Sequence, residues 1–101
     1  MNKPTCPHEV RELQLFLENT STYYERYLVP IAKAFQRRIA KGTFDASKAP
    51  RAYYRVCLDA SKDYEKDFSF KFSKSVRDVV AQNLATEYYE EIIAQGGAMF
   101  S

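Results

Sequence analysis

The sequence predicts an all-α protein folded as an antiparallel three-helix bundle, and three observations carry this prediction. The chain of 101 residues contains only three glycines and four prolines, fewer turn-forming residues than an all-β fold needs. Three long segments repeat apolar residues at helical spacing. Glycine directly follows the first and the last of these segments, where a helix is expected to end. A chain of this length forms one domain, so we expect residues 1–101 to share one core, with loose tails at 1–6 and 98–101.

The first segment, residues 7–41, predicts one long helix that is kinked near Pro30. Two weak points interrupt it: residues 19–22 are four poor helix formers in succession, and Pro30 removes a backbone hydrogen bond from the helix interior. Two helices that meet at Pro30 are the alternative. The apolar residues keep one phase through the proline, which favours the single helix. They form one stripe made of Val10, Leu13, Leu17, Tyr24, Leu28, Ile31, Phe35 and Ile39.

The second segment, residues 46–66, predicts a helix that runs antiparallel to the first. Gly42 ends the first helix, and either Asp45 or Ser47 caps the second. A short first turn that begins at Asp45 reconciles these two caps with the position of Pro50. Because the connection is short, the two helices should be antiparallel neighbours. The inner face of the second helix consists of Ala49, Tyr53, Val56, Cys57, Ala60 and Tyr64.

The third helix is expected to begin at Ser73 or Lys74 and to end at Gln95. The sequence from Ser75 to Asp78 resembles a capping box. Before this helix, residues 67–74 alternate phenylalanine with polar residues, which is a strand-like pattern, but no second strand is available for pairing. We therefore expect a connection whose phenyl rings cover the end of the core. The main apolar stripe of the third helix is Val76, Val80, Leu84, Tyr88 and Ile92.

The third helix carries more apolar surface than one neighbouring helix covers. Val79, Tyr89 and Ile93 lie off its main stripe. They predict either a position in the groove between the other two helices or a contact with another subunit, so a homo-oligomer is one expected partner. The chain also holds eight tyrosines, and each predicted helix places at least one on its inner face. Tyrosine suits the margin of a core, and a partner interface is its alternative use.

Charge is unevenly distributed along the chain. Residues 33–55 contain seven basic residues and one acid, a net charge of +6 that leaves −4 for the rest. The cations fall opposite the apolar stripes of the first two helices, where they could hold the phosphates of a nucleic acid or another polyanion. A solvated outer face is the alternative, and no recognition-helix pattern accompanies the cations. The candidate polyanion-binding residues are Arg26, Lys33, Arg37, Lys41, Lys48, Arg51, Arg55, Lys62 and Lys66.

No motif in the sequence points to catalysis, a cofactor or a metal. Glu87, Glu90 and Glu91 form an acidic cluster on the third helix, but His8 is the only histidine, so the remaining ligands of a metal site are lacking. The glycines end helices and form no phosphate-binding loop. We therefore expect a protein that is not an enzyme and that has no catalytic residues, no cofactor and no metal.

The cysteine count and the length of the apolar runs indicate where in the cell the protein is expected. Cys6 and Cys57 do not make a disulfide framework, and Cys57 lies on a predicted apolar helix face as a small core residue. No apolar run is long enough to span a membrane, and residues 1–10 lack the apolar part of a secretory signal. These features predict a cytoplasmic protein without a membrane partner.

A set of short motifs runs along most of the chain from about Glu12. The motifs are Val29-Pro30-Ile31, Lys33, Arg37-Arg38, Lys41-Gly42-Thr43-Phe44-Asp45, Ala49, Tyr53-Tyr54, Asp59-Ala60 and Ala85-Thr86-Glu87-Tyr88-Tyr89-Glu90-Glu91. Through this set, whose members are specific only together, the chain resembles a family of short helical proteins that is common in phage genomes and marine metagenomes. The resemblance implies an all-helical fold and a phage-like context, which would place the protein inside the host cell, but it implies no activity.

Two functions are compatible with these patterns. The first is a non-enzymatic binding or interaction protein of phage-like origin that acts through its helical surfaces. The alternative is a nucleic-acid-binding accessory protein that uses the basic hairpin of the first two helices.

Overall fold

The computed structural model describes residues 6–94, and these residues form helices without a strand among them. The prediction of an all-α protein is therefore confirmed. Of the expected tails at 1–6 and 98–101, only Cys6 lies within the described residues, and the stop at Gly96–Gly97 lies outside them. The elements are α1 (Pro7–Asn19), α2 (Ser21–Tyr23), the π-helical turn η1 (Tyr24–Leu28), α3 (Val29–Lys41), the 3₁₀ turn η2 (Ala46–Lys48), α4 (Ala49–Phe68) and α5 (Lys74–Ala94).

The prediction of three helices is wrong, because the first segment is broken at Thr20. This residue has extended backbone angles (φ −95°, ψ 107°), while its carbonyl accepts hydrogen bonds from the N–H groups of Tyr23 and Tyr24. The described chain thus contains four long helices: α1, α3, α4 and α5. Thr20 lies in the run of poor helix formers, and these residues favour helix ends over helix interiors.

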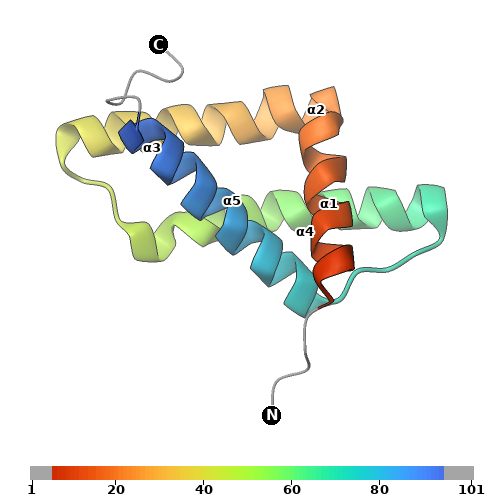
Figure 1. Ribbon diagram of the computed structural model, residues 1–101. Coiled ribbons are helices and arrows are strands. Elements are labelled where there is room, and N and C mark those ends of the chain that lie inside the picture. The colour runs from red at the N-terminus through yellow and green to blue at the C-terminus, as the bar shows by residue number, and fades with distance from the viewer. Residues whose placement is uncertain (1–5, 95–101) are drawn as a thin grey trace.

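Pro30, in contrast, neither ends nor interrupts its helix. The preceding turn is π-helical, and the Val29 N–H donates to the Tyr24 carbonyl, one residue further back than in an α-helix. A wider turn lets a proline lie in the chain path without the usual clash with the preceding carbonyl. The helix therefore continues from Ser21 to Lys41, and the change of direction comes at Thr20 instead of Pro30 (Figure 1).

The turn between α3 and α4 has the predicted chemistry. Gly42 is left-handed (φ 73°), and the Thr43 N–H donates to the Arg38 carbonyl at 2.9 Å, which closes the end of α3. Asp45 then accepts hydrogen bonds from the Ser47 N–H (3.0 Å) and the Ser47 hydroxyl (2.6 Å). It caps the short turn η2, after which α4 begins with a proline in its first turn.

The connection between α4 and α5 differs in part from the prediction. α4 continues to Phe68 and ends at Ser69, a serine in the left-handed region (φ 55°). Only Phe72 covers the core, with no exposed area, whereas Phe68 and Phe70 are exposed. The capping box predicted at Ser75 is wrong, because the hydroxyl of Ser73 accepts from the Val76 N–H at 3.2 Å and so caps the helix.

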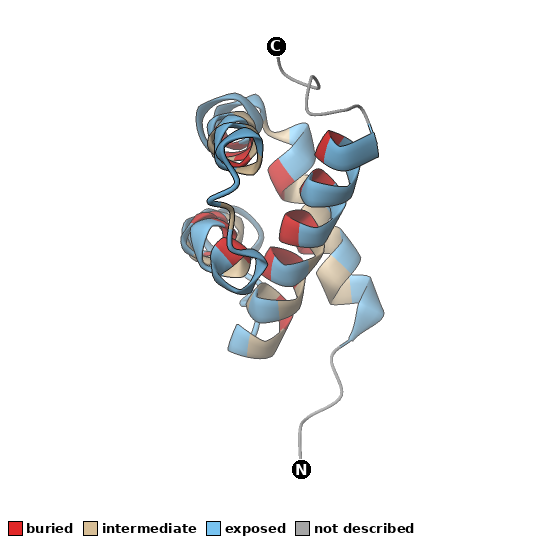
Figure 2. Cartoon of the chain, turned by 90° about the vertical axis from the view of Figure 1, so that its left-hand side faces the viewer, coloured by how far each residue is buried: buried red, intermediate tan, exposed pale blue. Residues whose placement is uncertain are grey.

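The helices form two sides around one core. α3 and α4 run antiparallel on one side, and α5 and α1 lie across them on the other (Figures 1 and 2). α5 packs against α4, α1 and α3, so it is the central helix of the fold. The expected close neighbours α3 and α4 are instead joined mainly through α5. The core residues contributed by α4 and α5 include every member of their predicted stripes except Tyr64, which is half-buried.

Candidate functional site

The nine candidate polyanion-binding residues are all exposed. On α3, the cations at 33, 37 and 41 follow each other at intervals of one turn, on the face opposite Phe35 and Ala32. The only ion pair among residues 6–94 joins Lys74 to Asp78. The described chain therefore does not neutralise any of the nine by a carboxylate of its own.

The longer basic row lies along α4 and its capping turn. It begins at Lys48, passes through Arg51, Arg55 and Lys62, and ends at Lys66, on the face opposite the buried Tyr53. At 1.5 Å per residue this row is about 27 Å long. Asp59 stands at its edge, and the end at Lys66 shares a hollow with Asp59, Asp63 and Asp67. Arg26 lies apart from both rows, in the π-helical turn η1.

An aromatic cluster holds the hairpin tip, from which both rows start, against the core. Phe35 packs edge-on against Phe44 (5.1 Å between ring centroids) and Tyr53 (5.5 Å). Phe44 and Tyr53 stack in turn on two neighbouring tyrosines of α5, Tyr89 and Tyr88. The connection from Thr43 to Lys48 is thereby fixed to both α3 and α5.

The tip also contains a hollow of about 420 Å³ whose lining includes one basic residue outside the predicted set. Arg38 and Lys48 line this hollow together with Phe35 and Phe44. Sequence reasoning counted Arg38 in the charged window but left it out of the candidate residues, because it is out of line with the other cations of α3. Its position in the last turn of α3, one turn before Gly42, was the available signal.

The three candidate interface residues do not form one surface. Val79 is half-buried and lines a groove between α1 and α5. Tyr89 is 37% exposed but stacks on Phe44 with an interplanar angle of 12°, so part of its surface is already used within the chain. Ile93 is 50% exposed near the end of α5. Of the three, Val79 is the one that lines this groove.

The acidic cluster extends beyond the three glutamates identified from sequence. Glu87 and Glu91 line a small notch of about 220 Å³ together with Glu18, Tyr24 and Tyr88. Burial raises the pKa of Glu87 above its ordinary value, and the carboxylates of Glu18 and Glu91 raise it further. The amide of Gln14 partly offsets this by donating to Glu87 at 2.8 Å. No group of three or more acidic, histidine or cysteine residues among residues 6–94 is arranged to hold a metal ion.

The two cysteines differ in environment. Cys57 has no exposed area, and burial raises the pKa of its thiol to about 12, so it is a core residue as predicted. Cys6 is exposed at the start of α1. Neither is in a disulfide.

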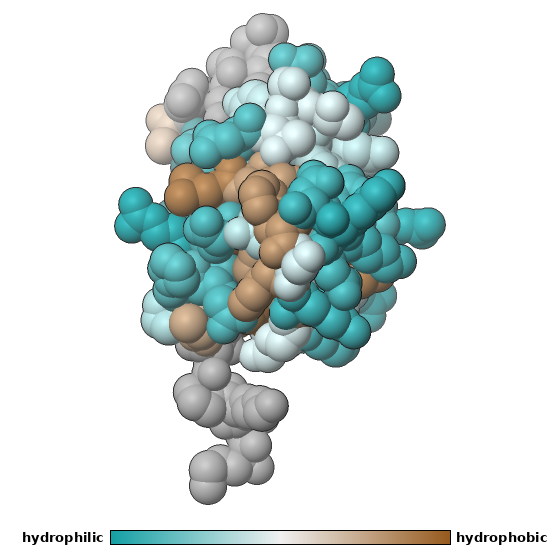
Figure 3. All heavy atoms as spheres, turned by 90° about the vertical axis from the view of Figure 1, so that its right-hand side faces the viewer, coloured by the Kyte–Doolittle hydropathy of each residue, from teal (hydrophilic) through white to brown (hydrophobic). Residues whose placement is uncertain are grey.

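A second aromatic group lies at the other end of the molecule. Figure 3 shows apolar side chains gathered in the middle of the end formed by α1 and the α4–α5 connection, inside a hydrophilic border. Tyr64 is the central ring of the aromatic group, and the ring centroids of Phe16, Phe68 and Phe72 lie within 5.3 Å of its own. The sequence pattern of alternating phenylalanines was the signal for this group.

No protein family, curated protein or solved structure matches the chain. The resemblance to phage-encoded helical proteins therefore stays a prediction. Within the described residues, no helix is both long enough and apolar enough to cross a membrane.

Proposed function

We propose that this protein is a small, non-enzymatic binding protein whose partner is a polyanion, with nucleic acid as the first candidate. The binding surface is the outward side of α3 and α4. The observation that carries the proposal is that all nine predicted cations are exposed and that none is ion-paired within the described chain. An intracellular, phage-like context belongs to the same proposal, since it would bring the protein close to nucleic acid.

The shape of the basic rows supports binding to phosphates along a backbone more than readout of bases. The α4 row is about 27 Å long, a length of duplex that carries roughly 16 phosphate charges. The cations are long, flexible side chains on rigid helices, and aromatic rings line the hollows at the two ends of the α4 row, beside Lys48 and Lys66. Contacts of this kind position a protein on nucleic acid without selecting a sequence.

The proposal is tested by fluorescence anisotropy with a labelled DNA duplex, a single strand of the same length and an RNA duplex. Salt is varied from about 50 to about 200 mM, because counterion release makes the logarithm of the binding constant fall linearly with the logarithm of salt. If about four cations reach phosphates, the logarithm of the binding constant should fall with the logarithm of salt with a slope of about −3.6. Similar affinity for unrelated sequences is also expected.

Single charge reversals inside and outside the two basic rows test whether these rows are the surface that binds nucleic acid. Arg37→Glu and Arg51→Glu lie in the two rows and should each weaken binding and reduce the salt slope by about 1 or more. Lys71→Glu changes the charge equally, at an exposed position on the α4–α5 connection, and should have a much smaller effect. The proposal fails if no nucleic acid or polyphosphate binds at low salt, or if all three variants weaken binding equally.

A further inference from the structure

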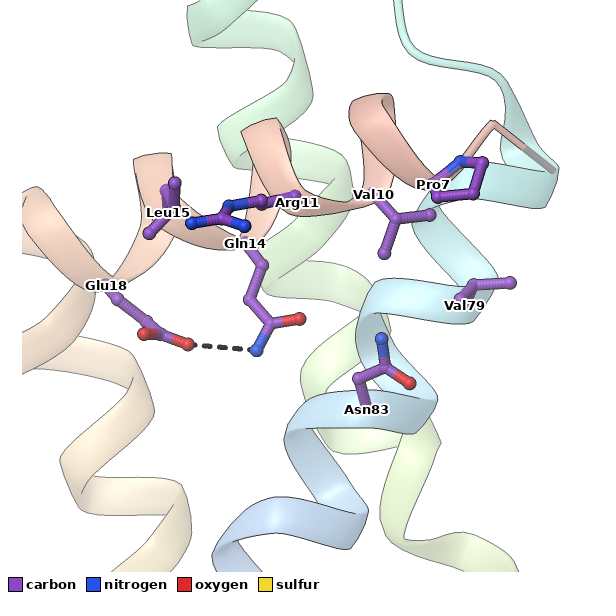
Figure 4. Close-up of a pocket in the computed structure, with 8 residues that line it drawn as sticks. All are labelled: Pro7, Val10, Arg11, Gln14, Leu15, Glu18, Val79 and Asn83. Carbon is purple, nitrogen blue, oxygen red and sulfur yellow. Dashed lines mark hydrogen bonds between the residues drawn. The ribbon is translucent and has the colours of Figure 1, made fainter.

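The groove between α1 and α5 is lined by apolar side chains together with two side chains of opposite charge, Arg11 and Glu18. Its volume is about 560 Å³, and its apolar wall consists of Pro7, Val10, Leu15 and Val79. Figure 4 shows Val10 and Gln14 pointing from α1 toward α5, with Arg11 and Leu15 along the outer edge. Leu15 is 40% exposed at the edge of this groove.

The two charged residues of this groove lie on either side of Leu15 along α1. Arg11 and Glu18 are both exposed, lie about two helical turns apart on α1, and have Leu15 between them. Arg11 forms no ion pair within residues 6–94. At the other end, the carboxylates of Glu18 and Glu87 share the single amide of Gln14, at 3.0 and 2.8 Å.

This arrangement is complementary to itself. If a second copy of α1 lies antiparallel against the first, a two-fold axis near Leu15 places each Arg11 beside Glu18 of the partner subunit. The two leucines then meet on the axis, and Val10 and Val79 flank them. An isologous contact of this kind uses the same patch on both copies and closes after two subunits.

We propose that the α1–α5 groove is a homodimer interface, with a second copy of this chain seated antiparallel on α1. The cation that the Glu18–Glu87 pair lacks within its own chain is Arg11 of the partner subunit. The contact is small and has charged edges, so the dimer should form and dissociate reversibly. The proposal is independent of nucleic-acid binding, because the groove lies on the α1–α5 side of the molecule and the basic rows on the other (Figure 2).

The test is the mass in solution, by sedimentation equilibrium from micromolar to millimolar concentration, for the wild type and two charge reversals. The wild type should pass from the monomer mass of 11.7 kDa to twice that value. Arg11→Glu places two carboxylates at each contact, and Glu18→Lys places two cations there. Each variant alone should weaken dimerisation about tenfold or more, since two ion pairs become two repulsions.

A mixture of the two variants decides the geometry. In the heterodimer, Glu at position 11 meets Lys at position 18 of the other copy, and the remaining Arg11 meets the remaining Glu18, so dimerisation should return. Circular dichroism serves to show that both variants keep their helix content, as expected for exposed positions. Charge reversal at the exposed Arg26, which lies outside the groove, is the matched control and should not change the mass.

Three results would overturn the proposal. The first is a monomer over the whole concentration range. The second is a dimer that the single reversals do not weaken. The third is a mixture of folded variants that stays monomeric, because an antiparallel pairing of α1 requires complementation.

Discussion

At the residue scale, Tyr53 combines a central position with an unsatisfied hydroxyl. Its ring has no exposed area and packs against Phe35 and Tyr88, but its Oη finds no hydrogen-bond partner within the described chain. A buried polar atom without a hydrogen-bond partner has lost its hydrogen bonds to water and gains none in the protein, which destabilises the folded state. Tyr53→Phe should therefore raise the free energy of unfolding by about 1 kcal/mol, measured by urea denaturation.

Tyr23 provides the matched comparison for this prediction. It is also buried, but its hydroxyl donates to the Asp63 carboxylate, and burial together with this bond raises its pKa. Tyr23→Phe removes the same atom and should lower the free energy of unfolding by about 1.5 kcal/mol. If Tyr53→Phe lowers the free energy of unfolding as Tyr23→Phe does, the Tyr53 hydroxyl has a hydrogen-bond partner and the prediction is wrong.

Glu87 makes stability depend on pH. Its pKa is raised by burial and by Glu18, so the folded state holds its proton more tightly than the unfolded state does. The stabilisation from that proton is complete at acid pH and is lost as the pH rises through the folded-state pKa. Glu87→Gln should thus raise the melting temperature at pH 7, and the gain should vanish below about pH 4. Glu25→Gln, at an exposed position in η1, is the control and should leave the melting temperature nearly unchanged both at pH 7 and below about pH 4.

At the scale of elements, the regular helices were predictable and the irregular ones were not. All members of the predicted stripes of α4 and α5 except Tyr64 are buried, because a helix packed on one side repeats its pattern every turn. The stripes missed Ser61, Ala81 and Ala85, small residues that are also buried. The first segment shows the limit. A stripe of constant phase predicts that Tyr24 is buried, but Tyr24 is 37% exposed and Tyr23 only 7%. The break at Thr20 and the wide turn η1 shift the phase, and propensity differences of a few tenths of a kcal/mol per residue do not locate such a break.

The beginning of α5 depends on a single cap. The Ser73 hydroxyl accepts from the Val76 N–H, and Arg77 supports the same turn by donating from Nη1 to the Phe72 carbonyl at 2.7 Å. Ser73→Ala leaves that N–H without its partner and should cost about 1 kcal/mol in thermal or urea unfolding. Ser73→Asp, which can cap in the same way, should retain most of the stability. Equal losses in the two variants would show that the hydroxyl is not the stabilising group.

At the scale of the whole molecule, the candidate surfaces were predictable to different degrees. The outward position of the cations followed from their place opposite the apolar stripes, and the structure keeps all nine exposed. The groove did not follow from sequence, because Gln14 and Glu87 are 73 positions apart and meet only when α1 crosses α5. Their contact depends on the turn at Thr20, which was the element the sequence did not locate.

The two proposed surfaces together predict a specific behaviour toward nucleic acid. The basic rows lie on the α3–α4 side and the groove on the α1–α5 side, so a dimer formed through the groove carries its basic faces on opposite outer sides (Figure 2). One short duplex cannot reach both faces. We therefore expect the dimer to bridge two duplexes, without binding a single short duplex more tightly than the monomer does.

Energy transfer between duplexes that carry donor and acceptor dyes measures this bridging directly. The wild type should bring the two dyes together at concentrations where it is dimeric. Arg11→Glu should still bind each duplex, as judged by anisotropy, but should give no transfer, and adding Glu18→Lys should restore it. The double variant Arg37→Glu with Arg51→Glu should dimerise normally, but it should show neither duplex binding by anisotropy nor energy transfer. Transfer that persists in Arg11→Glu would mean that bridging comes from two sites on one subunit, and the opposite placement of the basic faces would then not be its cause.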